Sequence, residues 1–466
     1  MQTKFSEAQL QNPRIAEANN LLRRCIHCGL CTATCPTYVL GGDERDSPRG
    51  RIYLMKEMFE AGGKPGKTVR TYVDHCLSCL SCVTACPSGV DYMHLVDLGR
   101  AHIEEKSSRP LRERAIRATL ANVLPHAGRF RLALWAAVPG RLLRRTLGRV
   151  GLRRLAAMLD LAPAGGPKRG TFAASGVVRP EGPKRHRVAL LMGCAQRSLR
   201  PSINDATIRL LTRHGVEVAI PEGQECCGAL VHHLGRHREA EAQIKRNVDM
   251  FNAPMRHEDF HAIIVNASGC GTMMKDYGHL LARDKAYAER AGQVASATMD
   301  ITEYLTKIGL APPKRWTDLT VAYHSACSMR NGQRIDAEPR ALLARAGFSV
   351  VDVGESHLCC GSAGSYNILQ PKTASELRDR KAKQITKTNA DVVATGNIGC
   401  ITQLQDAVNV PVVHTAELLD WALGGPCPRE LKALAGRARP VRKIAEDAPS
   451  QRSRFRRKQK VEETRG

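Results

Sequence analysis

The chain has 466 residues, of which 43% are hydrophobic and 4% aromatic, and its formal net charge is +25. This length is enough for about three domains with separate cores. No apolar run approaches the ~20 residues that a membrane-spanning helix needs, and the first residues lack the pattern of a signal peptide. A membrane-spanning helix is therefore not expected. Seventeen cysteines without an export signal argue against disulfides and predict a cytoplasmic location, and peripheral contact with the inner face of the cell membrane stays open.

Two runs near the N-terminus share one four-cysteine spacing. Residues 25–36 and 76–87 both read C-x2-C-x2-C-x3-C-P, the spacing that binds two [4Fe–4S] clusters in bacterial ferredoxins. In that arrangement the fourth cysteine of each run binds the cluster of the other run. A zinc ribbon needs two cysteine pairs rather than two triplets, so the pattern predicts iron–sulfur clusters and electron transfer. The first cluster is assigned to Cys25, Cys28, Cys31 and Cys86, and the second to Cys76, Cys79, Cys82 and Cys35.

Both runs belong to a first predicted domain, residues 1–105. Ser47 is a typical N-cap and Pro48 a typical first-turn residue, so a helix is predicted to begin between the runs. A helical insert favours an α-helical ferredoxin module over the compact, β-containing one. Arg49 and Arg51 on this helix are candidates for offsetting the negative charge of the clusters. The alternative is that both are solvated charges at the start of the helix.

The positive charge is concentrated in two segments. Residues 106–200 contain 21 Lys or Arg against three acidic residues, and residues 432–466 contain 12 against four. Residues 106–185 are predicted to be a basic helical connector that ends in a Gly- and Pro-rich linker. Within it, residues 141–159 alternate apolar and basic side chains, and their apolar face either docks on a membrane or partner or packs on the next domain. Residues 431–466 are predicted to be a basic, disordered tail.

An internal repeat occupies residues 186–310 and 311–430. Four cysteines of the first copy recur in the second at offsets of 133, 133, 133 and 130 residues, which indicates a duplication. In both copies short apolar segments alternate with helical stretches, a pattern that predicts parallel α/β layers with sites beyond the carboxyl ends of the strands. The two sets are Cys194, Cys226, Cys227 and Cys270, and Cys327, Cys359, Cys360 and Cys400.

These eight cysteines are candidate ligands of one or two further clusters or of another cofactor. Two alternatives stay open, namely buried structural thiols and a redox-active disulfide between the vicinal cysteines. Structural thiols do not need equal spacing, and a vicinal disulfide leaves four of the eight cysteines without a role. Cys427 lies outside every pattern and is predicted to be a spare thiol.

The sequence resembles the iron–sulfur subunits of bacterial glycolate oxidase, also called glycolate dehydrogenase, within the family of ferredoxin modules joined to duplicated cysteine-rich (CCG) domains. The resemblance rests on residues 28–38 and 42–51 and on the duplicated cysteine modules, and it extends from about residue 12 to about residue 425. It implies a multidomain α+β fold, in which an α-helical two-cluster ferredoxin module precedes two tandem α/β cysteine-rich repeats. In the wider family each repeat often ends in C-x2-C. Here Ala267 and Asn397 take the first of those positions, which weakens the resemblance to five-cysteine, disulfide-cleaving clusters.

The resemblance implies an electron-transfer subunit without catalytic residues of its own. FAD-binding partner subunits are expected to oxidise glycolate to glyoxylate, and this chain to pass the electrons to a quinone or another membrane acceptor. The sequence has no G-x-G-x-x-G at the start of a strand–helix unit, so FAD is expected on the partner only. The alternatives are the same role in a lactate or glycerol-3-phosphate dehydrogenase complex, or a disulfide reductase subunit. Nucleic-acid binding is not expected, because aromatic residues are few and no reading module is apparent.

Overall fold

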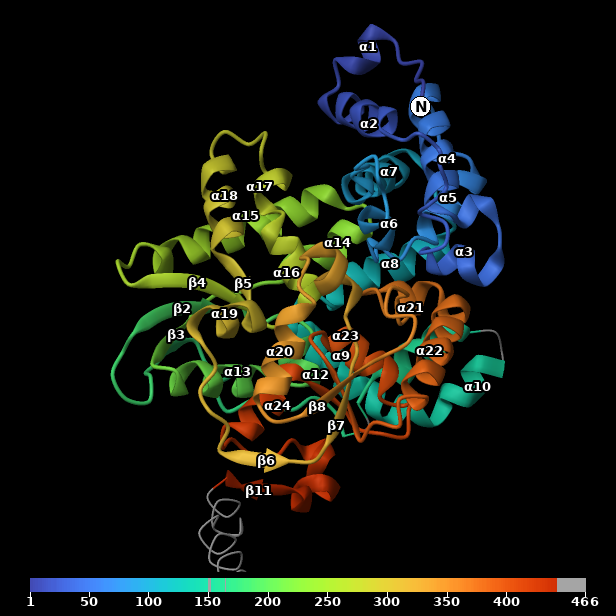
Figure 1. The fold of residues 1–466 in the computed structure, drawn as a ribbon. Helices are drawn as coiled ribbons and strands as arrows, with labels where there is room; N and C mark the ends of the chain where they lie inside the picture. The colour runs from blue at the N-terminus through green and yellow to red at the C-terminus, as the bar shows by residue number, and fades with distance from the viewer. Residues whose placement is uncertain (150–151, 164, 442–466) are drawn as a thin grey trace, which may run out of the picture.

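Helices alone build the N-terminal module, as the sequence predicted. The computed structural model describes residues 1–149, 152–163 and 165–441, and residues 1–106 contain no strand (Figure 1). The helix predicted between the two cysteine runs is α4, in which Ser47 Oγ accepts a hydrogen bond from the Gly50 N–H and Pro48 occupies the first turn. The helices are α1 (Glu7–Leu10), α2 (Pro13–Arg23), α3 (Pro36–Gly41), η1 (Glu44–Asp46), α4 (Pro48–Ala61), α5 (Lys67–Asp74), α6 (Ser81–Thr84) and α7 (Tyr92–Lys106).

The basic connector is a set of short helices with two different apolar faces. One face is buried against the repeats through Leu120, Phe130 and Leu134. Other large apolar side chains of the connector point to solvent. Within residues 141–159, Met158 packs against the repeats, whereas docking on a membrane or partner stays a prediction. The exposed set is Leu111, Leu132, Trp135, Leu142, Leu143, Leu152 and Leu155. The helices are α8 (Leu111–Val123), α9 (Ala127–Gly140), η2 (Arg141–Leu143), α10 (Arg144–Arg149) and α11 (Arg153–Leu161).

Each repeat contains a sheet of parallel strands in the same order. The first sheet runs β1-β3-β2-β4-β5 and the second β10-β9-β7-β8, so β3-β2-β4-β5 corresponds to β8-β7-β9-β10. Strand β1, which comes from the predicted linker, adds to the first sheet antiparallel to β3. The strands are β1 (Gly176–Val178), β2 (His186–Leu190), β3 (Val216–Ile220), β4 (Phe260–Val265), β5 (Thr298–Asp300), β7 (Thr320–Tyr323), β8 (Ser349–Asp352), β9 (Val392–Thr395) and β10 (Val412–His414).

Helices cover both sheets, and the two repeats pack on each other through a shared apolar core (Figure 1). The contact is also polar, because the Ser268 N–H donates to Gly396 O at 3.1 Å and Arg200 pairs with Glu417 at 3.0 Å. The first repeat has α12 (Gln196–Leu199), α13 (Ser202–Arg213), α14 (Ala229–His233), α15 (His237–Met255), α16 (Ser268–Lys275), α17 (Tyr277–Leu280), α18 (Ala288–Ala297) and α19 (Ile301–Ile308). The second has η3 (Ser328–Gly332), α20 (Ala337–Arg345), α21 (Tyr366–Leu369), α22 (Pro371–Thr386), α23 (Ile398–Leu404) and α24 (Thr415–Ala422).

The first residues of the predicted disordered tail are ordered, which corrects that prediction. Residues 431–441 contribute to η4 (Arg429–Arg437) and to β11 (Ala438–Pro440), which pairs antiparallel with β6 (Arg315–Thr317). Backbone pairing with β6 and burial of Leu431 fix this segment despite its charge. The rest of the predicted tail, residues 442–466, lies outside the described residues.

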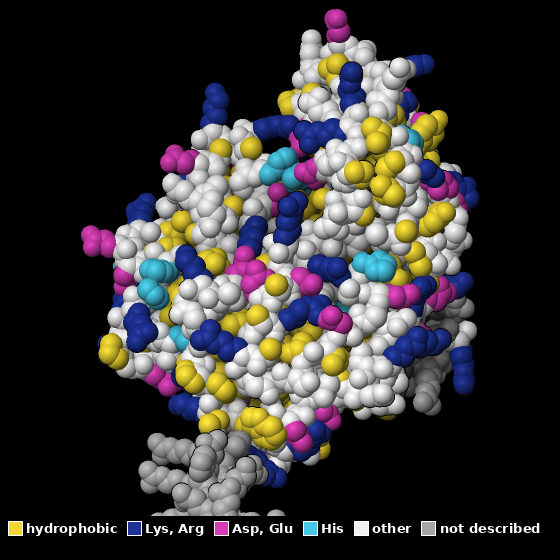
Figure 2. All heavy atoms as spheres, viewed as in Figure 1, with side chains coloured by type: hydrophobic (Ala, Val, Ile, Leu, Met, Phe, Trp, Pro, Cys, Tyr) yellow, Lys and Arg dark blue, Asp and Glu magenta, His cyan; other side chains and the backbone are white. Residues whose placement is uncertain are grey.

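No helix of the described residues is both long enough and apolar enough to cross a membrane. On the face shown in Figure 2, Lys and Arg side chains are interspersed with Asp and Glu instead of forming one continuous patch. The net positive charge therefore does not create a uniform basic surface on this face.

A charged histidine joins the ferredoxin module to the first repeat. His94 on α7 has Nδ1 2.6 Å from Asp91 Oδ2 and Nε2 3.0 Å from Oδ1 of Asp276, the residue after α16. Its ring also stacks on that of His279, with 3.6 Å between the ring centroids. Burial by itself lowers the pKa of His94, but the carboxylates of Asp276 and Asp91 outweigh burial and raise the pKa to about 10.

This contact predicts that stability falls in alkaline solution. The folded pKa of His94, about 10, is above the ordinary value of 6.5, so its stabilisation is complete below about pH 6.5 and is lost as the pH rises through about 10. We expect the urea midpoint of unfolding to decrease between about pH 7 and pH 10. The decrease should be smaller in the His94→Gln variant, which carries no charge at either pH. The same decrease in both proteins would contradict the assignment.

Candidate iron–sulfur centres

The four cysteines predicted for the first cluster line one pocket at the surface, and we call them the first group. Cys25, Cys28 and Cys31 come from the loop between α2 and α3, and Cys86 comes from the loop after α6. Gly29 has a φ of 82°, a left-handed conformation that curls this loop around the pocket. Cys25 is buried, whereas Cys28 is exposed. The first group therefore reaches the protein surface.

The four cysteines predicted for the second cluster form a second group in the protein interior. Cys35 precedes α3, Cys76 follows α5, and Cys79 and Cys82 lie at α6. All four side chains are buried. Burial raises the pKa of Cys82, and the charges on Cys79, Cys76, Cys35 and Cys31 raise it further. Cys82 also lines the pocket of the first group.

Arg51 provides a buried positive charge beside the second group. Its side chain is 1% exposed, and Nη1 donates to Cys35 Sγ at 3.6 Å while Nη2 donates to Asp46 Oδ1 at 2.9 Å. The interpretation as a solvated charge is therefore wrong for Arg51. Arg49 is half-buried; it pairs with Glu44 at 2.7 Å and donates to the His27 carbonyl at 3.2 Å, in the loop of the first group. Arg51 thus contacts a cysteine of the second group, and Arg49 contacts the loop of the first group.

The second group contacts the second repeat directly. Asn331 Nδ2 of η3 donates to Cys79 O at 2.8 Å, and Ser81 Oγ donates to His357 O at 2.7 Å. Burial raises the pKa of Cys79, and the charge on Cys327 of the second repeat raises it further. These contacts fix the distance between the second group and the cysteines of the second repeat.

The eight repeat cysteines converge in two groups at the carboxyl ends of the strands, where the sequence predicted a site. The first cysteine of each repeat follows β2 or β7, the vicinal pair follows β3 or β8, and the last lies on α16 or α23. All 17 cysteines of the chain are free. The sulfur–sulfur distances are 3.5 Å for Cys194–Cys226, 3.7 Å for Cys327–Cys359 and 3.5 Å for Cys360–Cys400. The third group is Cys194, Cys226, Cys227 and Cys270, and the fourth is Cys327, Cys359, Cys360 and Cys400.

The third and fourth groups share one cavity of about 590 Å³. All eight cysteines line it, together with Ala267 and Asn397, which stand where the wider family often has cysteine. Apolar side chains of α8, α9 and α11 also line the cavity, among them Leu120, Phe130 and Leu134. The connector therefore contributes to the cavity that the cysteines of both repeats share.

The protonation state of the cysteines indicates what the groups can bind. Burial raises the pKa of Cys31 to about 11. Hydrogen bonding to a neighbouring cysteine and burial raise the pKa of Cys194 and of Cys327 well above its ordinary value. Such thiols stay protonated at neutral pH unless a cation binds their sulfur atoms. Four convergent sulfur atoms are the ligand set of a [4Fe–4S] cluster, so each group fits the predicted cofactor.

Sequence reasoning missed two charged or polar side chains at the fourth group. Burial and the charge of Lys381 lower the pKa of His324 to about 3, so its imidazole is neutral. Burial lowers the pKa of Lys381, whereas thiolates at Cys360, Cys359 and Cys400 act to raise it. A residue-by-residue comparison of the two repeats would have revealed both, because neither is matched by a like residue in the first repeat.

Two family models match the parts of the chain that contain these groups. The 4Fe-4S dicluster domain matches residues 21–90, and the cysteine-rich domain of the CCG family matches residues 188–275 and again residues 321–405. The predicted fold class, an α-helical ferredoxin module followed by two tandem α/β cysteine-rich repeats, is confirmed.

Similar proteins extend over almost the whole chain. The glycolate oxidase iron-sulfur subunit of Escherichia coli is 40% identical, over 91% of this chain and 99% of the relative. The probable glycolate oxidase iron-sulfur subunit of Bacillus subtilis is 33% identical over the same shares, and the lactate utilization protein A of Bacillus subtilis is 27% identical over 50% of this chain and 99% of that protein. A crystal structure of a hypothetical protein from Helicobacter pylori matches with a TM-score of 0.53 at 9% identity, over 92% of this chain and 75% of the other, and supports the fold alone. The chain belongs to the family of glycolate oxidase iron–sulfur subunits.

Proposed function

We propose that this chain is the electron-transfer subunit of a flavin-dependent glycolate dehydrogenase and carries electrons from a FAD-binding partner to a quinone. The spatial order of the four sulfur groups supports this most directly. The first group reaches the surface, and the second is buried and contacts the second repeat. The third and fourth groups line an apolar cavity. Such a series joins a partner at the surface to an acceptor inside the protein.

Each sulfur group would hold one [4Fe–4S] cluster, with the four cysteines named for that group as its ligands. Bound clusters supply one-electron carriers whose potentials depend on nearby charge, burial and hydrogen bonds to sulfur. Side chains next to the cysteines of this chain provide such charge and hydrogen bonds. Arg51 donates to Cys35 Sγ at 3.6 Å, and the Tyr92 hydroxyl donates to Cys76 Sγ at 3.9 Å. The packing of α6 on η3 sets the spacing between the second and fourth groups.

Glycolate and FAD are assigned to partner subunits. Oxidation of an alcohol to an aldehyde transfers a hydride, and cysteine-ligated iron does not accept one, whereas a flavin does. The similar proteins of Escherichia coli and Bacillus subtilis are named as subunits of glycolate oxidase, which supports a flavoprotein partner. No residue of this chain is assigned a catalytic role.

The flavoprotein is proposed to dock at the first group. Ile26 and Leu30 flank Cys28 in the sequence and are 66% and 59% exposed. Large apolar side chains exposed next to a redox site are typical of an interaction surface. An FAD-binding subunit that covers these residues would approach the exposed Cys28 and exclude water from the contact.

The acceptor is proposed to enter beneath the connector. The wall formed by α8, α9 and α11 is apolar and faces both repeat groups, which suits the ring of a quinone. The exposed leucines of the connector lie among arginines, and residues 106–161 carry two acidic residues against 13 Lys or Arg. Apolar side chains surrounded by positive charge suit the surface of an anionic membrane. The proposed location is the cytoplasmic side of the cell membrane, with peripheral contact.

Replacing two connector leucines should weaken membrane binding. Leu142 and Leu143 are 87% and 59% exposed on η2. The double variant Leu142→Glu, Leu143→Glu is expected to bind vesicles of phosphatidylcholine and phosphatidylglycerol at least about tenfold more weakly, because each buried leucine contributes about 1.5–3 kcal/mol. Added salt should weaken binding of the unaltered protein. Leu10→Glu on α1 is the control; equal binding by all three proteins would contradict a membrane role of the connector.

The proposed substrate is tested in the complex purified without oxygen from its own host. We expect glycolate to reduce an added quinone analogue faster than D-lactate, L-lactate or glycerol 3-phosphate, with a flavoprotein co-purifying. Fastest reduction by lactate would assign the chain to a lactate-oxidising complex, a role that the similarity to lactate utilization protein A also allows. A flavin-containing complex without any dehydrogenase activity would contradict the proposal.

A further inference from the structure

The two repeats have equal sets of cysteines but differ in one buried side chain next to them. Leu191 and His324 are counterparts, since each lies three residues before the first cysteine of its repeat. Each also makes the same backbone contact, in which the Leu191 N–H donates to Ile264 O at 3.0 Å and the His324 N–H donates to Ala394 O at 2.8 Å. The second repeat therefore has an imidazole at the position where the first repeat has a leucine.

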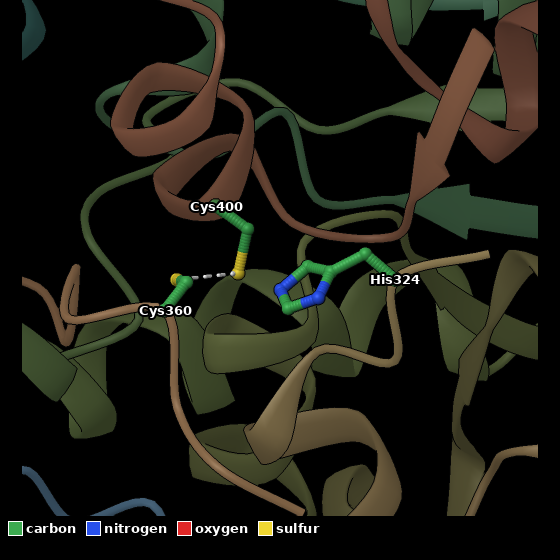
Figure 3. Close-up of side chains that lie close together, drawn as sticks. All are labelled: His324, Cys360 and Cys400. Carbon is green, nitrogen blue, oxygen red and sulfur yellow. Dashed lines mark hydrogen bonds between the residues drawn. The ribbon is translucent and has the colours of Figure 1, made fainter. Parts of the chain in front are cut away.

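The imidazole of His324 points toward the fourth group (Figure 3). The residue is 2% exposed, and its Nε2 has no hydrogen-bond partner among the described residues. A ligand nitrogen of the ring and the sulfur atoms of Cys360 and Cys400 all lie within 4.8 Å of one another. Leaving a buried polar atom without a partner costs about 1–3 kcal/mol. The orphaned nitrogen thus indicates that something else occupies the space between the ring and the cysteines.

A metal ion satisfies this geometry. Bonds from a metal to nitrogen and to sulfur are about 2.1 Å and about 2.3 Å long, so two ligand atoms on one metal lie within about 4.4 Å of each other. The observed separation of up to 4.8 Å needs only small side-chain shifts to reach that range. Neutral imidazole and thiolate are both good ligands for iron. The nearby cation, Lys381, donates to Glu355 O at 2.6 Å and has no lone pair to offer His324.

We propose that the imidazole of His324 is a metal ligand in the second repeat, where it takes the place of one of the four cysteines assigned above as ligands of the fourth group's cluster. The fourth group is then a mixed nitrogen–sulfur site that includes Cys360 and Cys400. The third group, with Leu191 in the equivalent place, binds its metal through sulfur alone. This inference rests on the proposed function, which places metal in both repeats. A neutral imidazole adds no negative charge, and histidine ligation raises the potential of iron–sulfur centres above that of all-cysteine ones. The fourth group is therefore the more oxidising of the two.

The test uses the full-length protein, labelled with ¹⁵N in its histidines only and purified without oxygen. Pulsed EPR of the partly reduced protein is expected to show the strong hyperfine coupling of a histidine nitrogen bound directly to the metal. The His324→Leu variant reproduces the environment of the first repeat and should lose this coupling. His357→Leu is the matched control, because His357 is two residues from Cys359 in the sequence but outside the His324–Cys360–Cys400 cluster, and it should keep the coupling. His324→Cys should retain iron without the nitrogen coupling, which keeps the test valid if the leucine variant does not fold.

Iron analysis of the Cys359→Ala, Cys360→Ala variant distinguishes failure of the His324 assignment from failure of the proposed metal site in the second repeat. If this variant loses iron but the unaltered protein shows no strongly coupled histidine nitrogen, His324 is not a ligand and the proposed function stands. A coupling that survives in His324→Leu overturns the assignment in the same way. If the cysteine variant loses no iron, the second repeat holds no metal, and both the inference and the metal assignment of that repeat are overturned.

Discussion

Replacing Cys79 with serine is expected to stop electron transfer from the flavoprotein to the acceptor and to remove about four iron atoms per chain. Cys79 belongs to the second group, which is the group that contacts the second repeat. Its backbone carbonyl accepts the hydrogen bond of Asn331 at 2.8 Å, so this contact does not need the thiol. Reduction of the partner's flavin by substrate should continue, because it does not involve the cysteines of this chain. Iron analysis and quinone reduction in the reconstituted complex measure both effects.

Cys427→Ser is the matched control for this variant. Cys427 is half-buried, lies outside all four sulfur groups, and donates to Pro428 O at 3.5 Å. The control should keep its iron and its rate of quinone reduction. Full quinone reduction by the Cys79→Ser protein, or equal iron loss in the two variants, would show that the second group does not carry the electrons.

Replacing Arg51 with methionine is expected to lower the reduction potential of the second group and to destabilise the ferredoxin module. The guanidinium is 1% exposed and contacts both Asp46 and Cys35. Reduction adds a negative charge to the group, so loss of a neighbouring positive charge makes reduction less favourable. Removing one partner of a buried ion pair leaves the other uncompensated and costs about 3–5 kcal/mol of unfolding free energy.

Arg49→Met tests whether burial of the arginine is what matters. Arg49 lies on the same helix, but its side chain is 33% exposed and its ion pair is with Glu44, which is itself 45% exposed. Exposed ion pairs contribute about 0–1 kcal/mol. Potentiometric titration followed by EPR gives the potentials, and loss of iron–sulfur absorbance in urea gives the stabilities. Equal effects of the two substitutions would contradict the role assigned to Arg51.

The features that were predicted from the sequence are those set by local spacing. Two cysteines separated by two residues can face one site only if the loop curls, and the structure has this curl at Gly29, with a φ of 82°. The offset of 133 residues predicted equivalent positions, and Cys194 and Cys327 indeed follow equivalent strands. Continuous apolar segments before the cysteines predicted buried parallel strands, among them β4 and β9.

The features that were not predicted depend on contacts between distant segments. Ser81 contacts His357, 276 residues away, and no local pattern indicates this pairing. The sequence could not show whether Arg51 is buried or exposed to solvent, because an arginine in the first turn of a helix is compatible with both environments. The shared cavity arises only when the two repeats and the connector pack together. His324 differs in kind from its counterpart Leu191, and this difference becomes meaningful only when the fold shows that both positions adjoin the cysteines.

The most direct test of the electron-transfer role is EPR of the anaerobically purified complex, frozen at intervals after glycolate is added. We expect the flavin to be reduced first and signals of reduced [4Fe–4S] clusters to follow at a rate no slower than turnover. The Cys79→Ser complex should still show reduction of the flavin, but it should lose the EPR signals of reduced clusters other than that of the first group. Fully reduced flavin without any iron–sulfur signal, at a time when quinone is being reduced, would show that the electrons do not pass through this chain.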